Sequence, residues 1–151
     1  MIVGSNSTNP PSLTIPSPAI AAKHATSTSD PAVISLIQHW LNTCSTSPSH
    51  KLCHQQLDHA STYPTRLIDV LPEGLPSSFW KLIEVQNEAI TGPFMTLSHR
   101  WGAGTIKLAR DTHQKMLSGM PLSVLPGAHQ DAIKVVKSLN VRYLWIDSIC
   151  L

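Results

Sequence analysis

The chain has 151 residues, of which 42% are hydrophobic and 13% are charged. This length and apolar content are sufficient for one domain with its own hydrophobic core. The net charge of +2 is too small to indicate nucleic acid or a membrane surface as a partner, and no apolar run approaches the roughly 18 residues that span a bilayer.

Residues 1–29 are rich in Ser, Thr and Pro. Such a stretch buries too little apolar area to offset the entropy lost on ordering, so we expect a disordered tail. It contains no charged region followed by an unbroken apolar run, which argues against a secretory leader. Three cysteines form no even disulfide framework. We therefore expect an intracellular protein in the cytoplasm.

The segment 30–63 is expected to precede the main domain. Asp30 and Pro31 are typical of a helix start, and apolar residues at helical spacing predict a helix over 31–43. Residues 45–62 are polar and predict a loop. Possible zinc ligands lie in and beside this loop, although their spacing fits no standard zinc finger, and ordinary cysteines in a His-rich loop are the alternative. These residues are Cys44, His50, Cys53, His54 and His59.

Residues 64–151 are expected to form an α/β domain. Short apolar or alternating runs predict strands, the first two as a hairpin, and helical periodicity predicts two helices. The strands are expected at 66–70, 80–85, 94–98 and 143–147, and the helices at 105–118 and 128–139. We expect the apolar face of the second helix to comprise Ala128, Ala132, Val135, Val136 and Leu139, with Asn140 as its cap.

The last two strands and the helix between them predict a βαβ unit with parallel strands. Each of these strands ends in polar side chains: Ser98 and His99 follow the first, and Asp147 ends the second. Parallel neighbours bring such ends to one edge of the sheet, where open α/β folds place their sites.

Two phrases at these strand ends are distinctive, namely Leu97-Ser98-His99-Arg100-Trp101-Gly102 and Arg142-Tyr143-Leu144-Trp145-Ile146-Asp147-Ser148-Ile149-Cys150. Both resemble the heterokaryon incompatibility (HET) domain of fungi. Leu125-Pro126 and Gln130-Asp131-Ala132-Ile133 stand between them, in the same order as in the family. The resemblance covers about residues 38–151. It departs from the family at Gly127-Ala128-His129, where we expect looser packing at the start of the crossover helix.

The resemblance implies a module for nonself recognition that ends in programmed cell death, with protein partners or self-association. The family has been compared with TIR domains, so it implies a partial TIR- or flavodoxin-like parallel sheet with flanking helices. Family members continue beyond the final cysteine, so we expect this chain to be the N-terminal part of the domain. The loss of further strands is expected to leave strand 143–147 with an open edge and the fold marginally stable.

Ser98, His99 and Asp147 are the candidate catalytic residues, as a nucleophile, a base and its orienting carboxylate. Adjacent residues on a strand point to opposite faces, so contact between Ser98 and His99 is not assured. Asp147 at a buried strand end suits acid–base or ribose-binding chemistry, and a salt bridge or cap is the alternative. The candidate ligand- or partner-binding residues are Trp101, Gly102, Arg142 and Asp131. Arg142 is suited to pair with an acidic group or a phosphate of a ligand, and a plain surface ion pair is the commoner alternative.

Two further side chains are expected in the core rather than in a site, namely Trp145 and Cys150. For Cys150 an inert buried thiol is favoured over a reactive one.

Three functions remain open on the sequence. The first is a signalling module, and the second is a TIR-like enzyme that cleaves NAD, with NAD as substrate and no resident cofactor. Some TIR domains use a glutamate, and residues 89–151 contain none. The enzyme would then need Glu73, Glu84 or Glu88 in its site, or residues outside this chain. The third is a truncated gene product without function.

Overall fold

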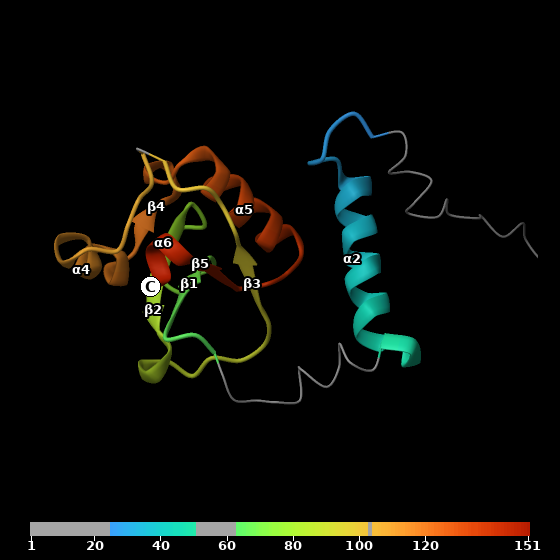
Figure 1. Cartoon of the computed structure of the whole chain (residues 1–151), viewed down its shortest axis with the longest axis horizontal. Helices are drawn as coiled ribbons and strands as arrows, with labels where there is room; N and C mark the ends of the chain where they lie inside the picture. Colours follow the sequence, from blue (N-terminus) through green and yellow to red (C-terminus); the bar gives the residue numbers. More distant parts are fainter. Residues whose placement is uncertain (1–24, 51–62, 103) are drawn as a thin grey trace, which may run out of the picture.

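The computed structural model describes residues 25–50, 63–102 and 104–151. Helices α2, α4, α5 and α6 span Pro31–Thr46, Arg110–Ser118, Gly127–Ser138 and Asp147–Cys150 (Figure 1). Strands β1 to β5 span Arg66–Asp69, Phe79–Glu84, Phe94–Leu97, Met120–Pro121 and Tyr143–Ile146. Short 3₁₀ turns lie at Pro48–His50, Val85–Asn87 and Leu122–Val124. No helix within the described ranges has the length and apolarity needed to cross a membrane.

The expected α/β class with flanking helices is confirmed by a five-stranded sheet in the order β3-β5-β1-β2-β4. The pairing of β3 with β5 is parallel, as the βαβ pattern predicts, and the crossover includes α5. The other pairings are antiparallel, so the sheet is mixed. The predicted hairpin of β1 and β2 is present, and β4, which the sequence did not reveal, pairs with β2.

The open edge expected at strand 143–147 is wrong. β5 is paired on both sides, with β3 and β1, and the edge strands are β3 and β4. The expectation assumed that the strands before β3 lie away from β5. Instead β1 runs antiparallel beside β5, with Ile68 opposite Leu144. Marginal stability therefore does not follow from an unpaired edge at β5.

The core lies on both faces of the sheet. Adjacent residues of β1 belong to different clusters, as alternation along a strand requires: Leu67 packs with Ile83 and Tyr143, and Ile68 packs with the larger cluster. The larger cluster also includes Trp80, Leu82, Met116, Ile133, Val136, Leu144, Ile146 and Ile149. Trp145 packs against both clusters, in agreement with the core role expected for it.

The two crossover helices differ from their predicted forms. α4 begins at Arg110 rather than 105, where the Ala109 backbone N–H donates to Thr112 Oγ1 at 3.0 Å. In α5 the buried residues are His129, Ile133 and Val136, whereas Ala128 and Val135 are exposed. The face predicted for α5 is therefore rotated by about one position, because a histidine occupies a place that an apolar pattern does not count. Asn140 ends the helix with a φ of 57°, as expected of a cap.

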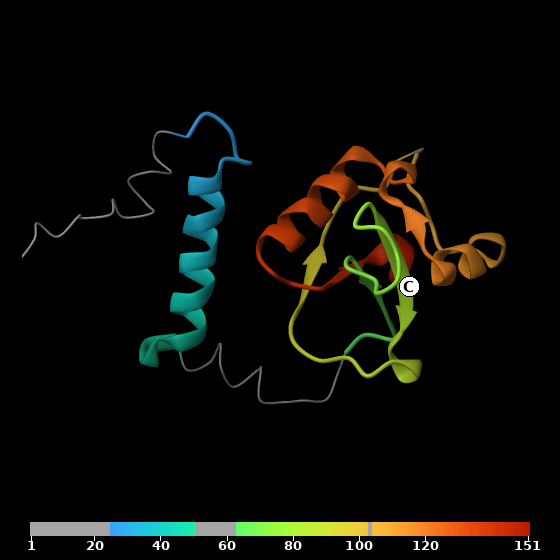
Figure 2. The same cartoon turned by 180° about the vertical axis from the view of Figure 1, so that it is seen from behind.

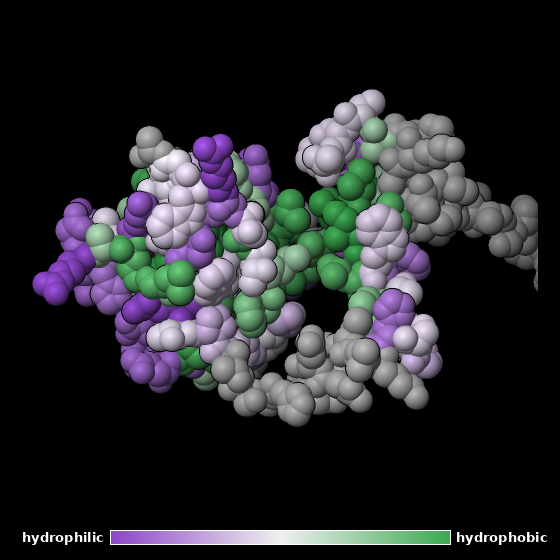
Figure 3. All heavy atoms as spheres, in the orientation of Figure 1, coloured by the Kyte–Doolittle hydropathy of each residue, from purple (hydrophilic) through white to green (hydrophobic). Residues whose placement is uncertain are grey.

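Helix α2 begins as predicted and lies beside the rest of the molecule. The Asp30 side chain accepts a hydrogen bond from the Ala32 backbone N–H at 2.8 Å, and Pro31 opens the first turn. In both views β3 is the strand nearest to α2 (Figures 1 and 2). Hydrophobic side chains of α2 face the main body (Figure 3), and Gln38 donates to the Ser138 carbonyl at the end of α5.

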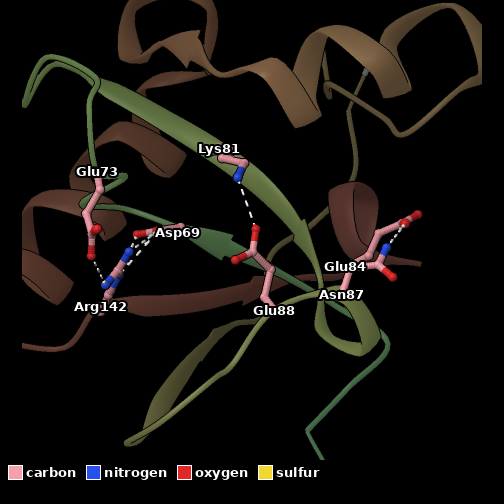
Figure 4. Close-up of polar contacts among 7 residues, drawn as sticks. All are labelled: Asp69, Glu73, Lys81, Glu84, Asn87, Glu88 and Arg142. Carbon is pink, nitrogen blue, oxygen red and sulfur yellow. Dashed lines mark hydrogen bonds and ion pairs between the residues drawn. The ribbon is translucent and has the colours of Figure 1, made fainter.

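A buried ion pair joins β1 to the start of β5 (Figure 4). Asp69 is 4% exposed, and its carboxylate accepts from Arg142 Nη2 at 2.8 Å and from the Leu71 backbone N–H at 2.9 Å. Arg142 Nη1 reaches Glu73 Oε1 at 3.2 Å. The hydrogen bonds with Asp69 raise the pKa of Arg142 above its ordinary value. The Arg142 carbonyl also accepts from the Val70 N–H, so the pair fixes the chain at the entry to β5.

Replacing Arg142 by alanine is expected to lower the free energy of unfolding by about 3 kcal/mol at neutral pH, because it leaves the Asp69 carboxylate buried without its counter-ion. Urea unfolding followed by far-ultraviolet circular dichroism measures the change. Lys134→Ala is the matched control, since Lys134 pairs with the exposed Asp131, and it is expected to cost under about 0.5 kcal/mol. Equal effects of the two variants would contradict the role assigned to the buried pair.

Candidate functional site

The parallel pairing of β3 and β5 brings their polar ends together. Leu97 is opposite Ile146, so both strands end at the same level of the sheet. The chain then enters the His99–Gly102 loop from β3 and the first turn of α6 from β5. The expectation that the two phrases meet at one sheet edge is confirmed, because Trp101 and Asp147 are hydrogen-bonded across 46 positions of the sequence.

Asp147 is the centre of this site. Its Oδ2 accepts from the Trp101 indole Nε1–H at 2.9 Å, and its Oδ1 accepts from the Ser148 backbone N–H at 2.7 Å. His99 Nδ1 lies 3.5 Å from Oδ1, which is within ion-pair distance but without hydrogen-bond geometry. The Asp147 side chain is 30% exposed, so the carboxylate is open to solvent on one side. The carboxylate therefore joins the Trp101 loop to the first turn of α6.

A second histidine, His129, packs against His99. Its ring comes from the first turn of α5, and the two ring centroids are 4.5 Å apart in an edge-to-face arrangement. His129 is 1% exposed, so the looser packing expected at Gly127-Ala128-His129 is wrong at its third residue. The sequence reasoning missed His129 as a site residue. Its i, i+4, i+7 spacing with Ile133 and Val136 was the available signal.

Trp101 is an exposed side chain whose indole ring is held by two contacts, a hydrogen bond from its N–H to Asp147 and the Lys107 ammonium over one face. It is 45% exposed, and the Lys107 ammonium lies 4.9 Å from its ring centroid, within cation–π distance. The loop is closed locally, since the Gly102 N–H donates to Thr105 Oγ1 at 2.7 Å. Further along, the Leu108 N–H donates to the Ser148 carbonyl at 2.8 Å, which ties this loop to α6.

Three sequence candidates do not join the cluster. Ser98 is exposed, and among the described residues its hydroxyl makes no hydrogen bond to His99 or Asp147, so a nucleophile–base contact is not formed. Arg142 lies at the opposite end of β5 and is engaged by Asp69 and Glu73. Asp131 is on the exposed side of α5, where it pairs with Lys134 at 2.8 Å.

The cysteine candidates are also placed apart from the site. Cys150 is buried, and this burial raises the pKa of its thiol to about 11, as the inert interpretation requires. Cys44 and His50 lie at the end of α2 and in the following turn, and Cys53, His54 and His59 fall outside the described residues. Within the described part of the chain, no group of three or more His, Cys, Asp or Glu residues has the arrangement of a metal site.

The three glutamates considered for an NAD-cleaving site, of which it would need one, have other partners (Figure 4). Glu73 pairs with Arg142, and Glu88 pairs with Lys81 at 3.1 Å. Glu84 accepts from the Asn87 amide and lies 3.3 Å from His113 Nε2. A cavity of about 180 Å³ along β2 is lined by Glu84 and Glu88, but not by His99 or Asp147.

Residues 94–151 match the family model described as "Heterokaryon incompatibility protein (HET)". No curated protein and no solved structure matches the chain. The match confirms the resemblance for this segment, which runs from the first residue of β3 to the end of the chain and includes Trp101, His129 and Asp147. The resemblance of the preceding residues stays a prediction.

The buried His129 predicts an acid-sensitive fold. Burial, and secondarily the proximity of His99, lowers the pKa of His129 from its ordinary 6.5, and Asp147 partly opposes the shift. The unfolded chain therefore binds the proton more readily than the folded chain. The stability that His129 contributes is present above pH 6.5 and is lost as the pH falls from there through the lower folded pKa.

In His129→Phe, a ring of similar size that does not titrate, we expect the free energy of unfolding to fall less between pH 7 and pH 5 than in the wild type. Urea unfolding at each pH measures this difference. His39→Phe is the control, because His39 is exposed on α2, and it is expected to keep the wild-type pH dependence. A His129→Phe profile that superimposes on the wild type would contradict the assignment.

Proposed function

We propose that residues 94–151 belong to a signalling module of the heterokaryon incompatibility type, which acts in nonself recognition and programmed cell death by contacting protein partners. The family match supports this class of function. The site supports contact with a protein as the mode of action, with Trp101 as the docking side chain. The proposal extends to self-association, in which the partner is a second copy of the module.

The observation that carries the proposal is the fixed, exposed indole of Trp101. Tryptophan is enriched at the energetic centres of protein interfaces, together with tyrosine and arginine. Trp101 is 45% exposed, its N–H is donated to Asp147, and Lys107 lies over its ring. An aromatic side chain that is already ordered loses little entropy when a partner covers it.

An NAD-cleaving activity has less support in this chain. Among the described residues the site has one carboxylate, that of Asp147, and both of its oxygens already accept hydrogen bonds, from Trp101 and Ser148. The described glutamates pair with Arg142, His113 and Lys81 rather than with the His99–Asp147 cluster. A histidine, a carboxylate and an exposed hydroxyl without mutual hydrogen bonds give no activated nucleophile.

We expect inducible expression of the full chain in a filamentous fungus to arrest growth, and Trp101→Ala to abolish the arrest. Truncating a central interface residue costs about 2 kcal/mol, or roughly thirtyfold in affinity. Colony growth and vital-dye uptake after induction measure the effect at matched protein levels. Trp40→Ala is the control, since Trp40 is 60% exposed on α2 and outside the site, and we expect it to retain the arrest.

Two outcomes contradict the proposal. One is arrest that survives Trp101→Ala, which removes the indole from the mechanism. The other is release of nicotinamide from NAD by the purified chain, at a rate that falls in Asp147→Asn, which assigns the site to catalysis instead.

A further inference from the structure

The His99 and His129 rings form a buried pair without hydrogen-bond partners. Both nitrogens of each ring are inaccessible to solvent, and none has a hydrogen-bond partner among the residues that the structure describes. Buried polar atoms are nearly always paired, because an unpaired one keeps the full cost of losing water. Of these four atoms, His99 Nδ1 has a carboxylate oxygen within 3.5 Å, so a proton on the His99 ring would give this atom an ionic partner.

Asp147 connects this pair to the molecular surface. Its Oδ1 is 3.5 Å from His99 Nδ1, and its Oδ2 holds the Trp101 indole N–H at 2.9 Å. A proton on His99 would turn the 3.5 Å approach into an ion pair with the carboxylate. The negative charge that attracts the indole N–H would then be shared with an imidazolium, so the Trp101 hydrogen bond would weaken.

The charged groups around the His99–His129 pair favour the protonation of one ring but not of both. From α6 the facing charge is Asp147, and from the loop after β3 the cations are Lys107, which lies over Trp101, and the exposed Arg100. From β1, Arg66 bonds the Cys150 carbonyl on α6. On α5 the nearest charges, Asp131 and Lys134, pair with each other on the exposed side. Two imidazolium rings 4.5 Å apart would repel each other with only one carboxylate beside them.

We propose that the His99–His129 pair is a proton-binding switch that takes up a single proton on His99 and transmits it through Asp147 to the exposed Trp101. His99 receives the proton because it faces the carboxylate and its side chain is 12% exposed, whereas His129 is 1% exposed. Burial lowers the pKa of His129, in agreement with a neutral second ring. The switch regulates the docking side chain of the proposed function, and in that respect rests on it.

A pH titration of the full chain, followed by NMR, tests the switch in the absence of any partner. In ¹⁵N-labelled protein the Trp101 indole N–H resonance, assigned with Trp101→Phe, is followed from pH 7.5 to 5.0. We expect one transition with the slope of a single proton, and on the acid side a lower protection of this N–H against exchange, relative to a free indole at the same pH. The transition is expected to be lost in His99→Gln and retained in His129→Phe, which keeps a ring packed against His99.

His113→Gln is the matched control, because His113 also faces a carboxylate, that of Glu84 on β2, and its replacement should leave the Trp101 transition unchanged. Far-ultraviolet circular dichroism and a dispersed spectrum establish that each variant is folded. A Trp101 resonance that does not move with pH in the folded wild type would overturn the switch, as would a transition that persists in folded His99→Gln. Loss of growth arrest in Trp101→Ala bears on the docking role alone, so the two proposals fail separately.

Discussion

The parallel pairing of β3 with β5 is the constraint on which the candidate site depends. These strands are joined by a long crossover, yet Leu97 and Ile146 lie opposite each other, so both chains leave the sheet at one level. Each strand is followed at once by polar residues rather than by further apolar ones. The site is therefore a direct consequence of register, because a shift of one residue would reverse the faces on which the side chains of one strand lie.

The two ends of β5 have different physical tasks. At its start, the buried Asp69 is neutralised by Arg142, which holds β1 and β5 together. At its finish, Asp147 is partly exposed, and among the described residues its hydrogen bonds come from its own turn and from the Trp101 loop. The Asp69–Arg142 pair fixes the start of β5 in the sheet. The Trp101 indole, at the other end of β5, is therefore exposed on a part of the surface that the fold holds in position.

The sequence predicted the features that depend on local pattern. The apolar runs that end at Leu97 and Ile146, with a helix between them, were sufficient for the βαβ unit and for the meeting of Trp101 and Asp147. The two phrases containing Trp101 and Asp147 were also sufficient for the resemblance to the family, which the match confirms for residues 94–151. These predictions succeeded because strand periodicity and turn chemistry act over a few residues.

The remaining features depend on contacts between distant segments. His129 was missed because its burial follows from the rotation of α5 against the sheet, and an apolar pattern does not count a histidine. A parallel sheet was expected rather than a mixed one, because no local sequence pattern indicates that β1 pairs with β5 in the antiparallel direction. Asp69 was read as an ordinary strand residue because its partner, Arg142, is 73 positions away.

The most direct test of the account is the register of β3 on β5, measured by interstrand nuclear Overhauser effects in the isotopically labelled chain. The parallel pairing predicts backbone contacts typical of parallel strands between Thr96 and Trp145 and between Leu97 and Ile146, together with a contact from the Trp101 indole proton to the Ser148 amide. Antiparallel contacts, or a β3 that pairs with another strand, would contradict it.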